Sequence, residues 1–311
     1  MTSPPRAVQA HPQPTIEPGD HSATSRRPLL VFLAVAFALP WLLWLLRLVS
    51  GLDILAAGGM AAVGIATFVT VRWFRPRTGP AIGTGLRAPF RWRTTVKQSA
   101  LAFAGMLGLA IAAIAIGAVA GVYSLDLDQF SGLRMVHAAG PADPVPVLLL
   151  SSLAQSILLF VVILPLAFCE EWGWRGFLLP RLRPIGAWPA LVLSGLIWGV
   201  WHLPGYVGPD RRPGLVPFLV FCVLLGILFG WLRLTTRSVW PSTVAHAANN
   251  TVVIGFVNVV PSDADQVAAA DPWSFGLSGW PGWIAMATAI VLFAAAGRAL
   301  AARKPSAHRA A

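Results

Sequence analysis

Residues 146–169 read PVLLLSSLAQSILLFVVILPLAFC, and this uncharged stretch decides the class of fold. A helix of about 20 apolar residues crosses the roughly 30 Å of hydrocarbon in a bilayer. Because the apolar residues are continuous rather than alternating, the stretch predicts a membrane-spanning helix and not a barrel strand. Other stretches of similar length and composition occur along the chain. The complete set of predicted spans is 28–49, 53–72, 100–123, 146–169, 188–207, 215–234, 239–260 and 282–302.

The composition of the whole chain agrees with an all-α, polytopic transmembrane bundle. Of its 311 residues, 56% are hydrophobic and only 11% are charged, whereas about a quarter of a soluble domain is charged. The two cysteines, Cys169 and Cys222, lie in separate apolar stretches and indicate no disulfide framework. The net charge of +11 resides mainly in arginines between the apolar stretches. We therefore expect the lipid bilayer as a partner, and no nucleic acid.

Charge in the connections predicts how the spans are oriented. Connections 72–98 and 175–184 carry arginine and lysine without any acidic residue. Connections 124–145 and 261–281 carry aspartates, with Arg134 as the only basic residue. Basic connections face the cytoplasm in most membrane proteins. The pattern predicts eight spans with both termini cytoplasmic, in a plasma membrane that the Ala-, Arg- and Pro-rich composition suggests is bacterial.

The chain divides into one membrane domain and two tails. Residues 1–27 are rich in Pro, Ser and Thr and predict a disordered cytoplasmic tail, not a secretory signal peptide. Residues 28–302 form the predicted transmembrane helical domain, in which the polar motifs fall within 146–260. Residues 303–311 form a basic cytoplasmic tail.

A small set of ionisable side chains lies within or directly after these apolar stretches. Each requires an explanation, because an ionised group in a membrane costs a few kcal/mol or more unless it is paired. Arg175 follows Glu171 by four residues, which places the two in ion-pair reach on a helix. Glu170 points away from Arg175, so we expect it to be available for chemistry. The set is Glu170, Glu171, Arg175, His202 and His246.

The two histidines are expected to face other helices. Gly195, Gly199 and His202 share one helix face, and small residues at this spacing let a neighbouring helix approach. Pro204 is expected to end or kink that helix. His246 and Asn250 share a face of another helix and form a candidate pair of hydrogen-bond donors. Each histidine could instead be only an interhelical hydrogen-bond residue.

Other residues have competing interpretations too. The Glu171–Arg175 pair could be purely structural. The aromatic residues Trp172, Trp174 and Trp198 favour packing over chemistry. Gly226 and Gly230, four residues apart, could pack helices within one chain or between chains.

With these three clusters the sequence resembles the CPBP family of intramembrane proteases, also called the CAAX-protease and bacteriocin-processing, or Abi, family. The family motifs are EExxxR, FxxxH and HxxxN or HxxxD. The first is matched by residues 170–175 and the third by residues 246–250, both in full. The second is matched by residues 198–202 with Trp198 in place of Phe. The resemblance implies a CAAX-prenyl-protease-like bundle whose polar cavity opens toward the cytoplasm.

The resemblance also implies a role for each matched residue. Glu170 and His202 would activate water, His246 and Asn250 would stabilise the oxyanion, and Glu171, Arg175 and Trp198 would support the site. A buried base beside hydrogen-bond donors is the arrangement that peptide hydrolysis requires. A zinc ion is the one cofactor under consideration, held by Glu170, His202 and His246. The HExxH spacing is absent, and we favour metal-independent water activation.

The favoured interpretation is therefore an intramembrane endopeptidase of the glutamic or metallo type. It would cleave a membrane-associated protein or peptide, which could itself carry a lipid. A first alternative is a non-catalytic membrane scaffold, such as a bacteriocin-immunity protein. A second is a proton-coupled transporter, which the lack of internal repeats and of paired broken helices disfavours.

Overall fold

The computed structural model describes residues 26–74, 84–86, 92–206 and 214–302. The predicted tails, 1–27 and 303–311, fall almost wholly outside these ranges. Within them the chain forms helices and no β-strand, with one isolated bridge between Leu125 and Ser262. The prediction of an all-α membrane bundle is confirmed.

Eight helices overlap the predicted spans, although their bounds and lengths differ from them. They are α1 (Arg27–Ser50), α2 (Ile54–Phe74), α4 (Trp92–Val119), α6 (Val145–Glu171), α8 (Ala187–Trp201), α9 (Leu215–Thr236), α10 (Trp240–Ala248) and α12 (Trp280–Ala302). Two π-helical segments continue α6 and α10, namely η1 (Trp172–Leu178) and η4 (Asn249–Val257). The remaining short elements are α5 (Ser131–Val136), α7 (Leu179–Leu182), η2 (Arg183–Ile185), η3 (Leu203–Gly205), α11 (Ala264–Ala269) and η5 (Gly276–Ser278).

Five helical segments of the described chain are long and apolar enough to cross a membrane. They are Arg27–Ser50, Ile54–Phe74, Trp92–Val119, Val145–Ile185 and Leu215–Thr236. Two further apolar helices, Ala187–Trp201 and Trp280–Ala296, are shorter. The apolar helices make this an integral membrane protein, whereas the count of eight spans stays a prediction.

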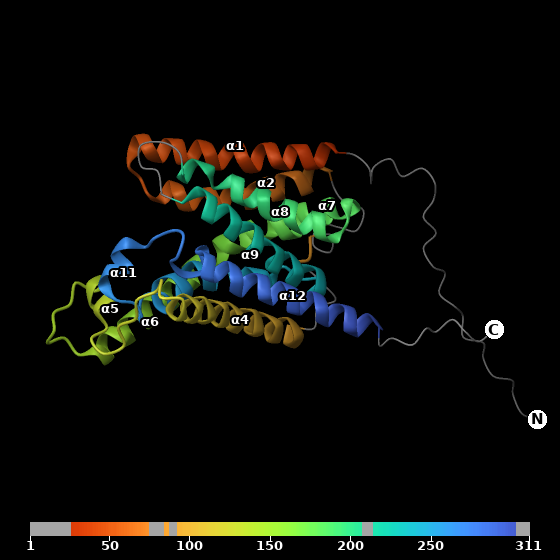
Figure 1. Ribbon diagram of the computed structural model, residues 1–311. Helices are drawn as coiled ribbons and strands as arrows, with labels where there is room; N and C mark the ends of the chain where they lie inside the picture. Colours follow the sequence, from red (N-terminus) through yellow and green to blue (C-terminus); the bar gives the residue numbers. More distant parts are fainter. Residues whose placement is uncertain (1–25, 75–83, 87–91, 207–213, 303–311) are drawn as a thin grey trace, which may run out of the picture.

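The helices pack in sequence-adjacent and more distant pairs (Figure 1). Helix α1 packs on α2, α8 on α9, and α4 on both α10 and α12. Helix α6 contacts α2, α10 and η4, so the segment that carries Glu170 lies against several neighbours. These neighbouring helices enclose the end of α6, so Glu170 and Glu171 lie inside the bundle rather than toward lipid.

Glycines bring α8 and α9 into direct backbone contact. A Cβ placed on Gly226 would lie 2.6 Å from the Cα of Gly195, and one on Gly230 would clash with Leu191 Cδ2. The predicted close approach at Gly195 is confirmed. The open question about Gly226 and Gly230 is answered by these contacts, because both residues pack within one chain.

At one end of the bundle, hydrogen bonds join the connection after α4 to the connection after η4. The Tyr123 hydroxyl lies 2.7 Å from Ser262 Oγ and donates to the Asn258 carbonyl at 3.0 Å. Nearby, Asp126 accepts hydrogen bonds from Ser131, through hydroxyl and backbone N–H, and from the Gln129 N–H, which lower its pKa to about 2. Figure 1 shows α5 and α11 at this end, and the start of α1 and the end of α12 at the other.

Candidate active site

Two of the three motifs lie where an α-helix becomes a π-helix. Helix α6 ends at Glu171 and η1 follows at once, while α10 ends at Ala248 and η4 begins at Asn249. π-Helical turns within α-helices are rare and occur frequently at functional sites. The change of register after Glu171 and after Ala248 sets the directions of the side chains on either side of each transition.

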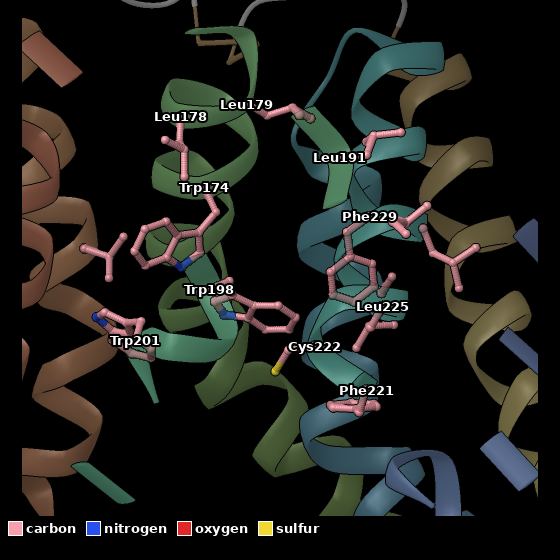
Figure 2. Packing of buried hydrophobic residues seen from close by; sticks show 14 of the residues in the cluster. Trp174, Leu178, Leu179, Leu191, Trp198, Trp201, Phe221, Cys222, Leu225 and Phe229 are labelled. Atoms are coloured by element: carbon pink, nitrogen blue, oxygen red, sulfur yellow. The ribbon is translucent and has the colours of Figure 1, made fainter. Parts of the chain in front are cut away.

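Glu170 is buried and binds two tryptophans. Its side chain is 1% exposed. The indole N–H of Trp198 donates to Glu170 Oε2 at 2.7 Å, and that of Trp174 donates to the same oxygen at 3.3 Å. Figure 2 shows both tryptophans among the buried side chains that pack between the helices. Since both bonds fall on Oε2, Oε1 is the oxygen left for water in the cavity that Glu170 lines.

Glu171 forms the predicted ion pair, and also a contact that the sequence did not predict. Arg175 Nη1 lies 2.8 Å from Glu171 Oε1, with both side chains fully buried. His246 Nδ1 lies 3.0 Å from the same oxygen. An ionised carboxylate only accepts hydrogen bonds, so Nδ1 carries the proton. The guanidinium of Arg175 also lies over the rings of Trp198, at 4.5 Å, and Phe229, at 5.2 Å.

His202 caps the C-terminal end of α8, which ends at Trp201. The expectation that Pro204 terminates this helix is confirmed, since Pro204 lies in the 3-10 turn η3. His202 Nδ1 lies 2.9 Å from the Trp198 carbonyl oxygen, which can only accept. The ring nitrogen Nδ1 is therefore the donor in this contact.

Asn250 and His246 do not take up equivalent positions. Asn250 lines the same cavity as Glu170 and His202, and its Oδ1 accepts a hydrogen bond from Asn249 Nδ2 at 3.0 Å. This leaves the Asn250 amide nitrogen as the donor. His246 is directed to Glu171 and lies outside the set of cavity-lining residues. Of the predicted pair, Asn250 therefore lines the cavity, whereas His246 contacts Glu171 of the buried ion pair.

The cavity has a volume of about 480 Å³ and mixed polar and apolar walls. Glu170, His202 and Asn250 reach it from α6, from the end of α8 and from η4. Three segments far apart in the sequence thus bring a carboxylate, an imidazole and a carboxamide to one hollow. The other lining residues are Trp44, Arg47, Leu48, Asp53, Ala56, Met60, Trp201, Pro204, Gly205, Tyr206 and Phe218.

The set of side chains considered for zinc does not fit one metal ion. Within the described ranges, no three His, Cys, Asp or Glu side chains form a group that could hold a metal. Glu170 and His202 line the cavity, whereas His246 does not. Glu170, His202 and His246 therefore do not form a shared ligand set.

The tryptophans are the part of the site that sequence reasoning undervalued. Trp174 and Trp198 do pack in the core, as predicted, but each also donates a hydrogen bond to Glu170. Trp174 follows Glu170 by four residues, and that helical spacing could have indicated its contact. No spacing rule could have indicated Trp198, which lies on a different helix.

Comparison with protein families identifies this region. Residues 151–252 match the family model described as Rce1-like, type II CAAX prenyl endopeptidase Rce1-like. The matched segment contains all three motifs, and it confirms the resemblance to CPBP family intramembrane proteases. No curated protein matches the chain. Together with the apolar helices, the family match supports a CAAX-type intramembrane endopeptidase, a protease that sits in the bilayer and acts on peptide or protein substrates.

Proposed function

We propose that the protein is an intramembrane endopeptidase in which Glu170 and His202 activate a water molecule for attack on a peptide bond. The observation that carries this proposal is the shared cavity of Glu170, His202 and Asn250, which come from three separate helical segments. The proposed substrate is a membrane-associated peptide or protein.

The proposed reaction begins with a water in the cavity that Glu170 and His202 both line. Glu170 takes one proton as the oxygen attacks the carbonyl carbon, and the developing oxyanion accepts a hydrogen bond from the Asn250 amide. The same proton then passes to the leaving amine as the C–N bond breaks. Water is consumed, and a carboxylic acid and an amine are formed.

Two neighbouring groups have supporting roles in this proposal. The Glu171–Arg175 pair fixes the orientation of the His246 ring through its Nδ1 contact with Glu171. His246 can donate to the oxyanion only through Nε2–H. This requires the doubly protonated ring, because Nδ1–H already donates to Glu171. Removing one oxyanion donor typically raises the barrier by about 2.7–4 kcal/mol.

Replacing His202 with Ala is expected to slow cleavage by about 10²- to 10⁴-fold, the usual contribution of a general acid–base group. The measurement is the turnover of a quenched peptide by purified protein in detergent. His137→Ala is the matched control, because His137 lies in the connection after α5 and contacts Ser152 at 2.6 Å, away from the cavity. An active His202→Ala enzyme with the turnover of His137→Ala would contradict the proposal.

A further inference from the structure

We propose that a groove between α4, α9 and α12 binds one anionic phospholipid, with an acyl chain along the groove and the phosphate beside Lys97 and Arg237. The groove shares no lining residue with the cavity of Glu170, His202 and Asn250. The proposal therefore stands apart from the proposed function, and it can be tested without a peptide substrate.

The groove has a volume of about 600 Å³ and mostly apolar walls. Helices α4 and α12 lie side by side (Figure 1), and both contribute to its lining. The rings of Trp231 and Phe293, which also line it, stack with centroids 4.3 Å apart. On α4 the lining includes Gly105 and Gly108, where a Cβ would meet no atom within 4 Å. The described side chains thus leave an apolar space that another apolar group can fill.

The length of the groove matches one lipid chain. Its lining residues on α4 extend from Gln98 to Leu109. At 1.5 Å per residue, this part of the helix is about 17 Å long. One leaflet supplies about half of the roughly 30 Å hydrocarbon layer of a bilayer. A groove of this length on a membrane-spanning bundle therefore accommodates an acyl chain from a single leaflet.

Two exposed cations stand at one end of the groove. Lys97 directly precedes Gln98, the first groove residue of α4. Arg237 directly follows Thr236, the last groove residue of α9. A third exposed cation, Arg93, lies one turn before Lys97 on α4. Basic residues beside grooves between membrane helices attract the phosphates of anionic lipids. The cations at the end of the groove and its apolar walls thus complement the two parts of an anionic phospholipid.

The same charges favour an anionic lipid over two other occupants. Residues 92–98 and 231–237 contain no Asp or Glu. A second copy of the chain, docked through the same face, would bring Lys97 and Arg237 of both copies together without acidic residues from these segments to offset them. A zwitterionic lipid carries a cation of its own in the head group, so it gains less from Lys97 and Arg237 than an anionic lipid does.

A lipid chain in the groove would pack against a side chain that also borders the buried ion pair. Phe229 lines the groove. Its ring lies 5.7 Å from that of His246 and 5.2 Å from the guanidinium carbon of Arg175. A ligand that binds only the folded protein raises its stability by mass action. Bound lipid should therefore raise the Tm of the protein as well as being detected directly.

Lipid binding by the purified full chain in an uncharged detergent tests the proposal. The probes are a phosphatidylglycerol and a phosphatidylcholine with identical acyl chains, and native mass spectrometry gives the apparent Kd of the first lipid bound. A lysine or arginine near an anionic head group contributes about fivefold in affinity, so two contribute about 25-fold. We therefore expect phosphatidylglycerol to bind about 10- to 30-fold more tightly than phosphatidylcholine, and to raise the Tm more at equal concentration.

Replacing the two cations tests the head-group contact. Lys97→Gln combined with Arg237→Gln should reduce the preference for phosphatidylglycerol to about threefold or less, because the attraction to the phosphate is lost. The matched control combines Arg72→Gln with Arg183→Gln, which removes two exposed cations outside the groove and should leave the preference unchanged. Equal affinities of the wild-type protein for the two lipids, or an equal loss of preference in both double variants, would overturn the proposal.

Filling the groove tests the contact with the acyl chain. Gly105→Leu should weaken binding of phosphatidylglycerol by about tenfold or more, because the new side chain occupies the space of the lipid chain. Ala100→Leu, at an exposed position of α4 outside the groove, is the matched control and should bind like the wild-type protein. Wild-type affinity of Gly105→Leu for phosphatidylglycerol would overturn the proposal. If Gly105→Leu does not fold, Gly108→Leu, where a Cβ has the same free space, replaces it in the comparison.

Discussion

Replacing Glu170 with Gln is expected to reduce peptide cleavage by about 10³- to 10⁴-fold, the upper range for loss of a general base. The amide has the shape of the carboxyl group and its oxygen can still accept from Trp198, but it cannot take a proton from water. The fold should be retained, because a neutral amide costs less to bury than an ionised carboxylate. Initial rates with a quenched peptide, beside thermal unfolding in the same detergent, measure both effects.

The matched control for this acid-to-amide change is Asp128→Asn. Asp128 is exposed in the connection between α4 and α5, away from the cavity, and its variant should cleave at the wild-type rate. A Glu170→Gln protein that keeps more than a tenth of the wild-type rate would remove Glu170 from the proposed mechanism. An unfolded Glu170→Gln protein would contradict the expected tolerance of the amide, and Glu170→Asp would then test the base by its position alone.

Replacing Arg175 with Met is expected to lower the free energy of unfolding by about 3–5 kcal/mol, because it leaves the Glu171 carboxylate buried without its ion-pair partner. Both side chains of the pair are 0% exposed. The adjacent His246 contact would lose its fixed acceptor geometry, so activity should fall as well. Denaturant-induced unfolding in detergent micelles measures the stability change.

Two further variants separate the charge from the packing. Adding Glu171→Gln to Arg175→Met removes the unpaired charge, so the double variant should be more stable than the single one. Arg47→Met breaks an ion pair whose side chains are 38% and 84% exposed, and should cost at most about 1 kcal/mol. If Arg175→Met cost no more than Arg47→Met, the buried pair would have no structural role.

The features that could be predicted from the sequence are those that depend on residues close together in one segment of the chain. Apolar stretches of spanning length became helices, and the four-residue spacing of Glu171 and Arg175 became an ion pair, because both depend on one helix. The end of α8 near Pro204 follows from the missing N–H of proline in the same way.

The parts that the sequence did not predict depend on how helices rotate against each other. Trp198 reaches Glu170 from another helix, and His246 reaches Glu171 from a third. The expectation that the His246 and Asn250 side chains lie on one helix face assumed a continuous α-helix. The chain instead becomes π-helical at Asn249, and that change of register is not readable from the residue types.

The glycine contact between α8 and α9 limits how a substrate can approach from the side. The backbones meet at Gly195 and Gly226, with no room for even one added carbon. A lipid-embedded segment cannot slip between these two helices while that contact persists. Any lateral approach to the cavity must therefore use another part of the bundle; Trp44 of α1 and Met60 of α2 are among the residues that line it.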